Sequence, residues 1–222
     1  MTAMYRCAIT QSRDASPDLT GRIDALCQWA TVWALSGIDL IQIREKDLGE
    51  AALTAVTRTV LEAVAKVREE KMNAGERDPK LPLVVVNRGL QSAMKAEADG
   101  LHLPGGWHMA DGMTVDMARW GFEQSRLPLK MISGACHTIE EAMVAAEKGI
   151  ELLLAGPVFE KTGSTAKPIG IAGLERIIKA AGAVPVLALG GITVENAREC
   201  VAAGAAGVAG IRLFQQDGWQ RL

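Results

Sequence analysis

Eight short apolar runs alternate with longer amphipathic segments along this chain, and this alternation limits its possible folds more than any other feature. The runs are Tyr5–Thr10, Ile38–Ile43, Leu81–Asn87, Asp99–Leu103, Leu129–Gly134, Glu151–Gly156, Val184–Gly190 and Ala206–Ile211. Runs that are apolar almost throughout are typical of strands buried on both faces, as in a parallel sheet covered by helices.

The segments between the runs carry helical patterns. The clearest are Leu19–Ser36, Glu50–Glu70, Ile139–Gly149, Gly173–Gly182 and Val194–Gly204. Thr138 with Glu141 predicts a capping box, and Thr193 with Asn196 predicts a weaker cap. Gly149, Gly182 and Gly204 stand where helix C-caps are expected. Residues 104–126 predict only a short helix after a glycine-containing loop, and the polar stretch Glu69–Lys80 predicts a solvated loop.

Eight strand–helix units predict a (β/α)8 TIM barrel, with an open doubly wound sheet as the alternative. No linker or low-complexity segment divides the chain, so we expect one domain over residues 1–222.

Composition argues against several classes of partner. The net charge of −2 gives no surface for a polyanion, and 4% aromatic residues do not make a base-stacking platform, so neither nucleic acid nor an anionic membrane is expected. The N-terminus lacks a signal-peptide core, and no apolar run approaches the roughly 20 residues that span a bilayer. The four cysteines are widely spaced, which favours reduced thiols. A cytoplasmic protein is expected.

The second run ends abruptly in charges, as "GIDLIQIREKDL". In a barrel, side chains at the C-terminal ends of the strands face the active-site mouth. Arg44 and Lys46 would then meet an anionic ligand there. Alternatively, they pair with Glu45 and Asp47 on a solvated turn.

The other strand ends supply more cations and amides than carboxylates. The candidate mouth residues are Gln42, Arg44, Lys46, Asn87, Arg88, His102, His137, Lys161, Lys167, Gly190, Gly191 and Arg212. This set favours binding of phosphate or pyrophosphate over acid–base work by paired carboxylates. Gly190 and Gly191 follow the seventh strand, where barrels commonly bind phosphate through backbone N–H groups, and we expect Arg212 and a helix N-terminus near Thr193 to assist. His102 and His137 are expected to be packed and hydrogen-bonded, and Cys136 to be a small buried hydrophobe.

The motifs "QIREKDL", "VVVN", "ADGLHL", "GACHTIEEA", "LLAGPVF", "PVLALGGIT" and "AAGAAGVAGI" resemble, in order and spacing, the thiamine-phosphate synthase and TenI-like family over roughly residues 38–212. The resemblance implies a (β/α)8 barrel, usually a homodimer. It also implies a transferase that joins hydroxymethylpyrimidine diphosphate to a thiazole phosphate and releases pyrophosphate with help from Mg²⁺.

The resemblance also implies roles for individual residues. Gln42, Arg44 and Lys46 would contact the pyrimidine diphosphate beside Asn87, with Arg44, Lys46 and Lys167 as catalytic residues. The loop after Phe159 would supply Lys161, Thr162, Ser164, Thr165 and Lys167. Gly190 and Gly191 would hold the thiazole phosphate.

The chain departs from the family pattern at the metal-binding positions. Arg88 stands where the family has a magnesium aspartate, and Trp107 stands at the offset of a second one, with Asp111 as a replacement if the loop has an insertion. Ala135 and Arg212 replace usual serines. Pro157 takes the position of the histidine that TenI-type tautomerases use.

Three functions therefore remain open at this stage. The first is a thiamine-phosphate synthase, the second a TenI-like thiazole phosphate tautomerase, and the third a degenerate barrel that binds a phosphate ligand without catalysis. We further expect Arg88, with Arg44 and Lys46, to bind the anion in place of the metal. The alternative is that Arg88 extends into solvent and the anion site has decayed.

Overall fold

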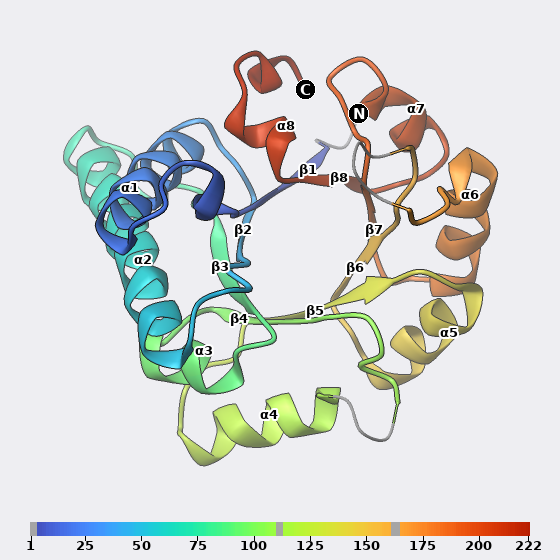
Figure 1. The fold of residues 1–222 in the computed structure, drawn as a ribbon, viewed down its shortest axis with the longest axis horizontal. Helices are drawn as coiled ribbons and strands as arrows, with labels where there is room; N and C mark the ends of the chain where they lie inside the picture. Colours follow the sequence, from blue (N-terminus) through green and yellow to red (C-terminus); the bar gives the residue numbers. More distant parts are fainter. Residues whose placement is uncertain (1–3, 110–112, 161–164) are drawn as a thin grey trace.

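The eight strands close into one barrel. A computed structural model describes residues 4–109, 113–160 and 165–222. The strands are all parallel and follow chain order, and β1 pairs with β8 as well as with β2 (Figure 1). The (β/α)8 TIM barrel is confirmed, and the open doubly wound sheet is wrong because an open sheet would leave β1 and β8 as edges.

The observed strands lie within the predicted apolar runs, except that β5 continues two residues further. They are β1 Tyr5–Ile9, β2 Leu40–Ile43, β3 Leu83–Asn87, β4 Gly100–Leu103, β5 Met131–Cys136, β6 Leu152–Ala155, β7 Val186–Leu189 and β8 Gly207–Gly210. The apolar runs therefore located every strand of the barrel.

Helices surround the barrel (Figure 1). They are α1 Leu19–Leu35, α2 Glu50–Asn73, α3 Leu90–Ala96, α4 Val115–Gln124, α5 Ile139–Lys148, α6 Gly170–Ala181, α7 Ala197–Ala202 and α8 Arg212–Gln215, with 3₁₀ turns η1 Ser12–Asp14 and η2 Trp219–Arg221. Among the described residues, no helix combines the length and the apolar character needed to cross a bilayer.

The helix ends confirm one cap and correct two boundaries. Thr138 and Glu141 form the predicted capping box of α5. The predicted loop at Glu69–Lys80 is wrong in its first part, because α2 continues to Asn73 through residues that favour helix. The helix predicted from Val194 begins only at Ala197, although Thr193 and Asn196 make the reciprocal hydrogen bonds expected of the weaker cap in the preceding turn.

Alternation along the strands sorts the core into two layers. A small cluster fills the barrel interior and includes Leu40 and Val85, whereas Val84 and Val86 belong to the larger cluster that contains the helix side chains. Successive side chains point to opposite faces of a strand. Gln42 lies two residues beyond Leu40 and Asn87 two beyond Val85, so both face the barrel interior near the mouth.

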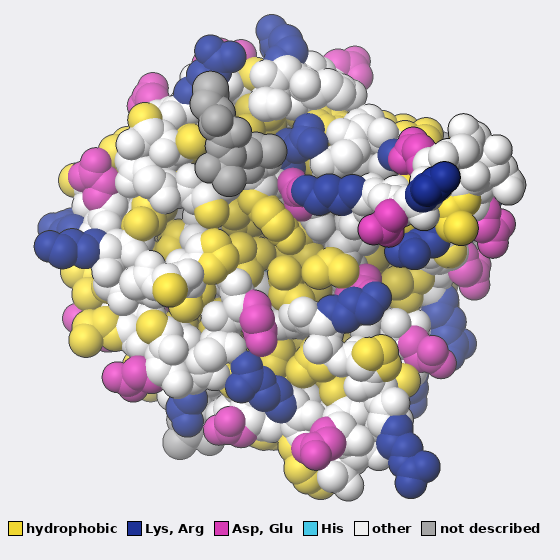
Figure 2. Space-filling view, turned by 180° about the vertical axis from the view of Figure 1, so that it is seen from behind, with side chains coloured by type: hydrophobic (Ala, Val, Ile, Leu, Met, Phe, Trp, Pro, Cys, Tyr) yellow, Lys and Arg dark blue, Asp and Glu magenta, His cyan; other side chains and the backbone are white. Residues whose placement is uncertain are grey.

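The opposite, N-terminal edge of the barrel is held by three acids. Asp39, Asp99 and Glu151 each precede an even-numbered strand and accept a hydrogen bond from a backbone N–H of the strand before. The respective cations beside them are Lys80, Lys130 and Arg119. Seen from behind the view of Figure 1, the molecule has an apolar centre surrounded by side chains of both charges (Figure 2).

Candidate active site

A cleft of about 580 Å³ opens at the C-terminal ends of the strands. Most of the predicted mouth residues line it together, namely Gln42, Arg44, Lys46, Asn87, Arg88, His102, His137 and Gly190. Arg44 and Gly190 therefore lie at the same mouth although β2 and β7 are far apart in the sequence. This part of the sequence prediction is confirmed.

The charges that follow β2 divide into two groups. Glu45 is buried, at 4% exposure, and accepts hydrogen bonds from the Ser12 hydroxyl at 2.8 Å and the Arg22 guanidinium at 2.7 Å. Arg22 also binds Asp47 at 2.7 Å, and hydrogen bonding to Asp47 and then to Glu45 raises the pKa of Arg22. Both carboxylates thus pair with a cation on α1.

Sequence reasoning missed Arg22, although a pattern could have identified it. Arg22 is spaced four residues from Leu26, which is itself four residues from Ala30, and all three are buried. An arginine on the buried stripe of a helix needs a buried anion as its partner.

Arg44, unlike Asp47, lines the cleft. Its backbone N–H donates to the Thr10 hydroxyl at 2.9 Å, which fixes the chain as it leaves β2. Burial lowers the pKa of the Arg44 guanidinium, and within the described ranges this side chain makes no hydrogen bond or ion pair. A half-buried cation in that state favours binding of an anion.

Polar side chains lie at and directly beneath the cleft surface on the β2–β5 side, with Ser133 fully buried. Asn87, His102 and Ser133 are neighbours in register across β3, β4 and β5, and His102 Nδ1 lies 2.9 Å from the Ser133 hydroxyl. Complete burial, and secondarily the charge of Arg44, lower the pKa of His102 to about 3, so its ring is neutral at physiological pH. Among the described residues no donor reaches the buried Gln42 Oε1, and the residue lines the cleft.

His137 lines the same cleft beside β6. Its Nδ1 donates to the carbonyl oxygen of Gly156, and its backbone N–H donates to Glu141. Because a carbonyl can only accept, the proton sits on Nδ1 when the ring is neutral. The expectation that His102 and His137 are hydrogen-bonded residues is confirmed. Cys136 is buried as expected, and burial raises its pKa to about 12.

The side of the cleft formed by the other strands is apolar. Its lining residues include Ile9, Leu154, Pro157, Leu189 and Ile211. The mouth is thus cationic and amide-rich on one side and hydrophobic on the other, which suits a heteroaromatic ring that carries a charged tail.

A second cleft of about 520 Å³ adjoins the first and shares Leu189, Gly190 and Ile211 with it. Gly190 and Gly191 have φ values of +90° and +68°, and a Cβ on Gly191 would lie 2.5 Å from the carbonyl oxygen of Glu160. Only glycine therefore allows the chain to pass here, with its backbone along the cleft.

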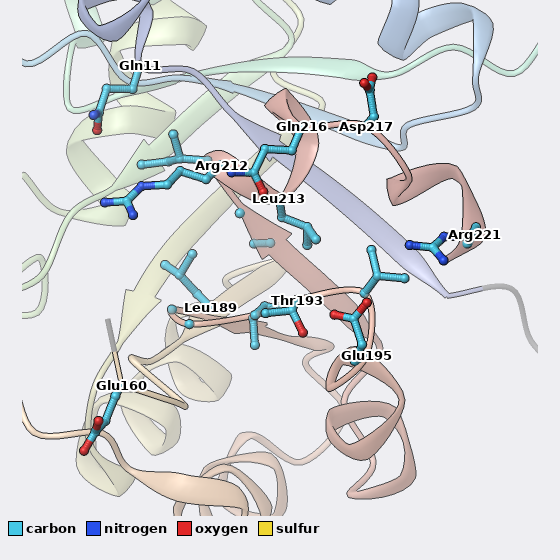
Figure 3. A pocket seen from close by; sticks show the side chains of 17 residues that line it. Gln11, Glu160, Leu189, Thr193, Glu195, Arg212, Leu213, Gln216, Asp217 and Arg221 are labelled. Atoms are coloured by element: carbon cyan, nitrogen blue, oxygen red, sulfur yellow. The ribbon is translucent and has the colours of Figure 1, made fainter. Parts of the chain in front are cut away.

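Side chains of both charges line the second cleft, with Glu160, Glu195 and Asp217 beside two arginines. Figure 3 shows Arg212, from α8, extending on the side of Gln11, and Arg221, from η2, beside Glu195. Sequence reasoning missed Gln11, whose place two residues after the end of β1 was an available signal. It also missed Arg221, for which no pattern exists. The helix N-terminus expected near Thr193 is not there, because α7 begins at Ala197.

The remaining predicted residues lie at the rim or beyond the described ranges. Ala166 lines the first cleft, whereas Thr165 and Lys167 on either side of it are exposed and are not part of its lining. Lys161, Thr162, Ser164 and Asp111 lie outside the described residues.

The described residues do not fit a Mg²⁺ ion at the mouth. Mg²⁺ is bound through carboxylate and phosphate oxygens, and the only carboxylate among the described lining residues of the first cleft is Glu45, which Ser12 and Arg22 already occupy. Trp107 is buried and donates its indole N–H to the Ala135 carbonyl at 2.9 Å. Across the described ranges, no group of three or more His, Cys, Asp or Glu residues is arranged to hold a metal.

Comparisons with known proteins agree on one family. The family model described as thiamine monophosphate synthase matches residues 7–214. The thiamine-phosphate synthase of Chloroflexus aurantiacus is 32% identical over 177 residues, which are 79% of this chain and 71% of that protein. The one from Methanoculleus marisnigri is 34% identical over 192 residues, covering 85% and 80%.

A solved structure agrees at the level of the fold. The thiamine phosphate pyrophosphorylase of Pyrococcus furiosus superposes with a TM-score of 0.71 at 24% identity, covering 98% of this chain and 91% of that one. With a family model that spans nearly the whole barrel, and with synthases as relatives, the chain belongs to the thiamine monophosphate synthase family.

Proposed function

We propose that this protein is a cytoplasmic thiamine-phosphate synthase, which transfers the hydroxymethylpyrimidine group from its diphosphate to a thiazole phosphate and releases pyrophosphate. The observation that carries the proposal is the pair of adjoining clefts with a shared wall at Leu189, Gly190 and Ile211. One cleft presents cations and amides, and the other presents a glycine backbone beside Arg212. A bimolecular transfer needs two anionic substrates held next to each other.

Each group has a chemical role in this proposal. Arg44 and Lys46 bind the diphosphate, and they stabilise the charge that develops on it as the bond to the pyrimidine methylene breaks. Asn87 and the unpartnered Gln42 Oε1 orient the pyrimidine. The ring nitrogen of the thiazole then forms the new bond to the methylene carbon.

The remaining proposed contacts lie around the second cleft and the rim. Gly190 and Gly191, with Arg212, bind the thiazole phosphate through backbone N–H groups and a guanidinium. Thr165 and Lys167, exposed beside Ala166, approach the diphosphate when substrates are bound.

A tautomerase is less well supported. It would need one phosphate site and a proton-transferring side chain, and the position that the TenI-type resemblance assigns to that histidine is Pro157, which carries no titratable group. The pairing of two clefts favours the transferase.

Gln42 provides the test. Thiamine phosphate and pyrophosphate should both form when the two substrates are mixed with the purified protein. Gln42→Leu should raise KM for the pyrimidine diphosphate about 10-fold or more, because a buried donor on the ring loses its acceptor, and should leave KM for the thiazole phosphate unchanged.

Gln215→Leu is the matched control. Gln215 also has a buried amide atom without a partner but lines neither cleft, so both KM values should stay as in the wild type. Absence of product with both substrates, or equal effects of the two variants, would refute the assignment.

We also propose that the chain acts as a single domain and assembles as a homodimer. The resemblance supports the dimer, and exposed apolar side chains on the outer face of α4, Met117 and Trp120, offer surface for it. Analytical ultracentrifugation at micromolar concentration should give twice the mass of 23.6 kDa; a monomer would contradict it.

A further inference from the structure

The side chains that line the first cleft are unbalanced in charge. Three are cationic, Arg44, Lys46 and Arg88, and the carboxylate among the described lining residues is Glu45. Glu45 is almost completely buried and is held by Ser12 and by Arg22 of α1. Its carboxylate is therefore paired with Arg22, although its charge also acts on Arg44.

We propose that the cleft binds the diphosphate group directly through Arg44, Lys46 and Arg88, without a bridging divalent cation. This inference rests on the proposed function, since the diphosphate is that of the proposed substrate. The proposed function names the reaction, whereas this inference names the positive charges that bind the diphosphate.

Arg44 supplies the buried part of this site. Removing a guanidinium from water without giving it a partner costs free energy. A phosphate oxygen is the ligand that best offsets this cost. Its planar fork matches phosphate in a bidentate manner, as an ammonium cannot. The backbone of Arg44 is held by the hydrogen bond from its N–H to the Thr10 hydroxyl.

Arg88 supplies a cation at the rim, held by its backbone. Its φ is +65°, which is uncommon for a residue with a side chain. Its N–H donates to the His102 carbonyl and its own carbonyl accepts from Leu90, both at 3.0 Å. The first bond ties the end of β3 to β4, and both set the backbone from which the exposed Arg88 side chain extends. A guanidinium beside the cleft attracts a diphosphate and repels a free dication.

The neighbouring loop does not restore a metal site within the described residues. Trp107, which follows β4, is 2% exposed and places its indole against β5 at Gly134 and Ala135. An indole offers a donor and an apolar ring, and neither binds a metal cation as an oxygen ligand would.

The experiment is a calorimetric titration of inorganic pyrophosphate into the wild-type protein, once in excess chelator and once in excess Mg²⁺. We expect binding in chelator. Arg88→Ala should weaken this binding about 10- to 100-fold, the value of a charge-assisted hydrogen bond, and Arg88→Lys should restore part of it.

Arg126→Ala is the matched control. Arg126 is also an exposed arginine with a positive φ, +54°, but it lies in the loop between α4 and β5, at the opposite end of the barrel. A general effect of removing an arginine from left-handed backbone would appear in both variants, whereas a direct contact with pyrophosphate appears only in Arg88→Ala.

Two results would overturn the proposal. Binding that requires Mg²⁺ would do so, and its loss in Asp111→Asn would then assign the metal to that residue. Binding in chelator that ignores Arg88→Ala would remove Arg88 from the site. Product formation with strictly Mg²⁺-dependent pyrophosphate binding would reject this inference and keep the synthase. Pyrophosphate binding that persists in chelator and depends on Arg88, without product formation, would keep this inference and reject the synthase.

Discussion

At the scale of single residues, burial determines what the mouth can do chemically. Gln42, Arg44 and His102 all lie at the ends of strands, yet they differ in state. Among the described residues, the Gln42 Oε1 has no hydrogen-bond partner and the half-buried Arg44 guanidinium makes no hydrogen bond, whereas His102 is neutral and bonded to Ser133. Only the first two are available to bind a substrate group.

The neutral state of His102 predicts a pH dependence of stability. Its pKa is about 3 in the folded protein and 6.5 in the reference state, so the unfolded chain binds more protons between these values. The stabilising contribution is complete above pH 6.5 and is lost as pH falls toward 3. The unfolding free energy of His102→Asn, from urea titrations at pH 7, 6, 5 and 4, should therefore fall less steeply than that of the wild type.

A second measurement isolates the ring itself. The Hε1 resonance that disappears in His102→Asn should keep a constant chemical shift from pH 8 to pH 5 in the wild type. A shift that titrates near pH 6.5 would show that the ring is charged inside the barrel and would contradict the burial argument.

At the scale of elements, the strands are joined at their N-terminal edge by side chains as well as by the sheet. Asp39, Asp99 and Glu151 repeat the same contact before β2, β4 and β6, each accepting from the backbone of the preceding strand. Each carboxylate also meets a cation, so its charge is not left alone. This repeat stabilises the end of the barrel that carries no site.

Asp99→Ala tests the contribution of this contact. Val84 is buried and its N–H donates to Asp99 at 2.8 Å, so removing the acceptor should lower the free energy of unfolding by about 1–3 kcal/mol in denaturant titrations. Asp116→Ala is the control, because the Asp116 pair with Lys148 is exposed and should contribute less than about 1 kcal/mol. Equal losses would mean that the backbone contact is not what stabilises the edge.

At the scale of the whole molecule, closure of the barrel depends on β8 lying directly against β1. Gly207 pairs with Tyr5 at this seam, and a Cβ on Gly207 would overlap the Tyr5 carbonyl oxygen. Because the obstruction is backbone, no change of rotamer relieves it. The seam therefore requires glycine at this place.

Gly207→Ala should accordingly destabilise the whole barrel, by about 3 kcal/mol or more, as overpacking against a fixed backbone does. Gly49→Ala is the matched control, because a Cβ there meets nothing within 4 Å and its φ is −71°. Thermal and urea unfolding of both variants measure the difference. A Gly207→Ala protein as stable as the Gly49→Ala protein would show that β1 and β8 separate at little cost.

The sequence by itself determined the strands, the fold class and most of the residues at the mouth. These follow from local patterns, since apolar runs locate strands and the residue that ends a parallel strand must face the mouth. For this reason Arg44, Asn87 and Gly190 were predicted to lie at one mouth and they line one cleft, whereas Lys167, predicted with them, is not part of its lining.

Only the tertiary structure decided which partner each charge takes. "REKDL" reads as a mixed run, and nothing local indicates that Glu45 and Asp47 pair with Arg22, which lies 23 and 25 residues earlier. The same holds for the ring of His137 against Gly156 and for Arg221 at the second cleft. Pairing across such distances depends on how α1, the strands and the C-terminal turn pack, and that packing is set by the closed barrel as a whole rather than by any one segment.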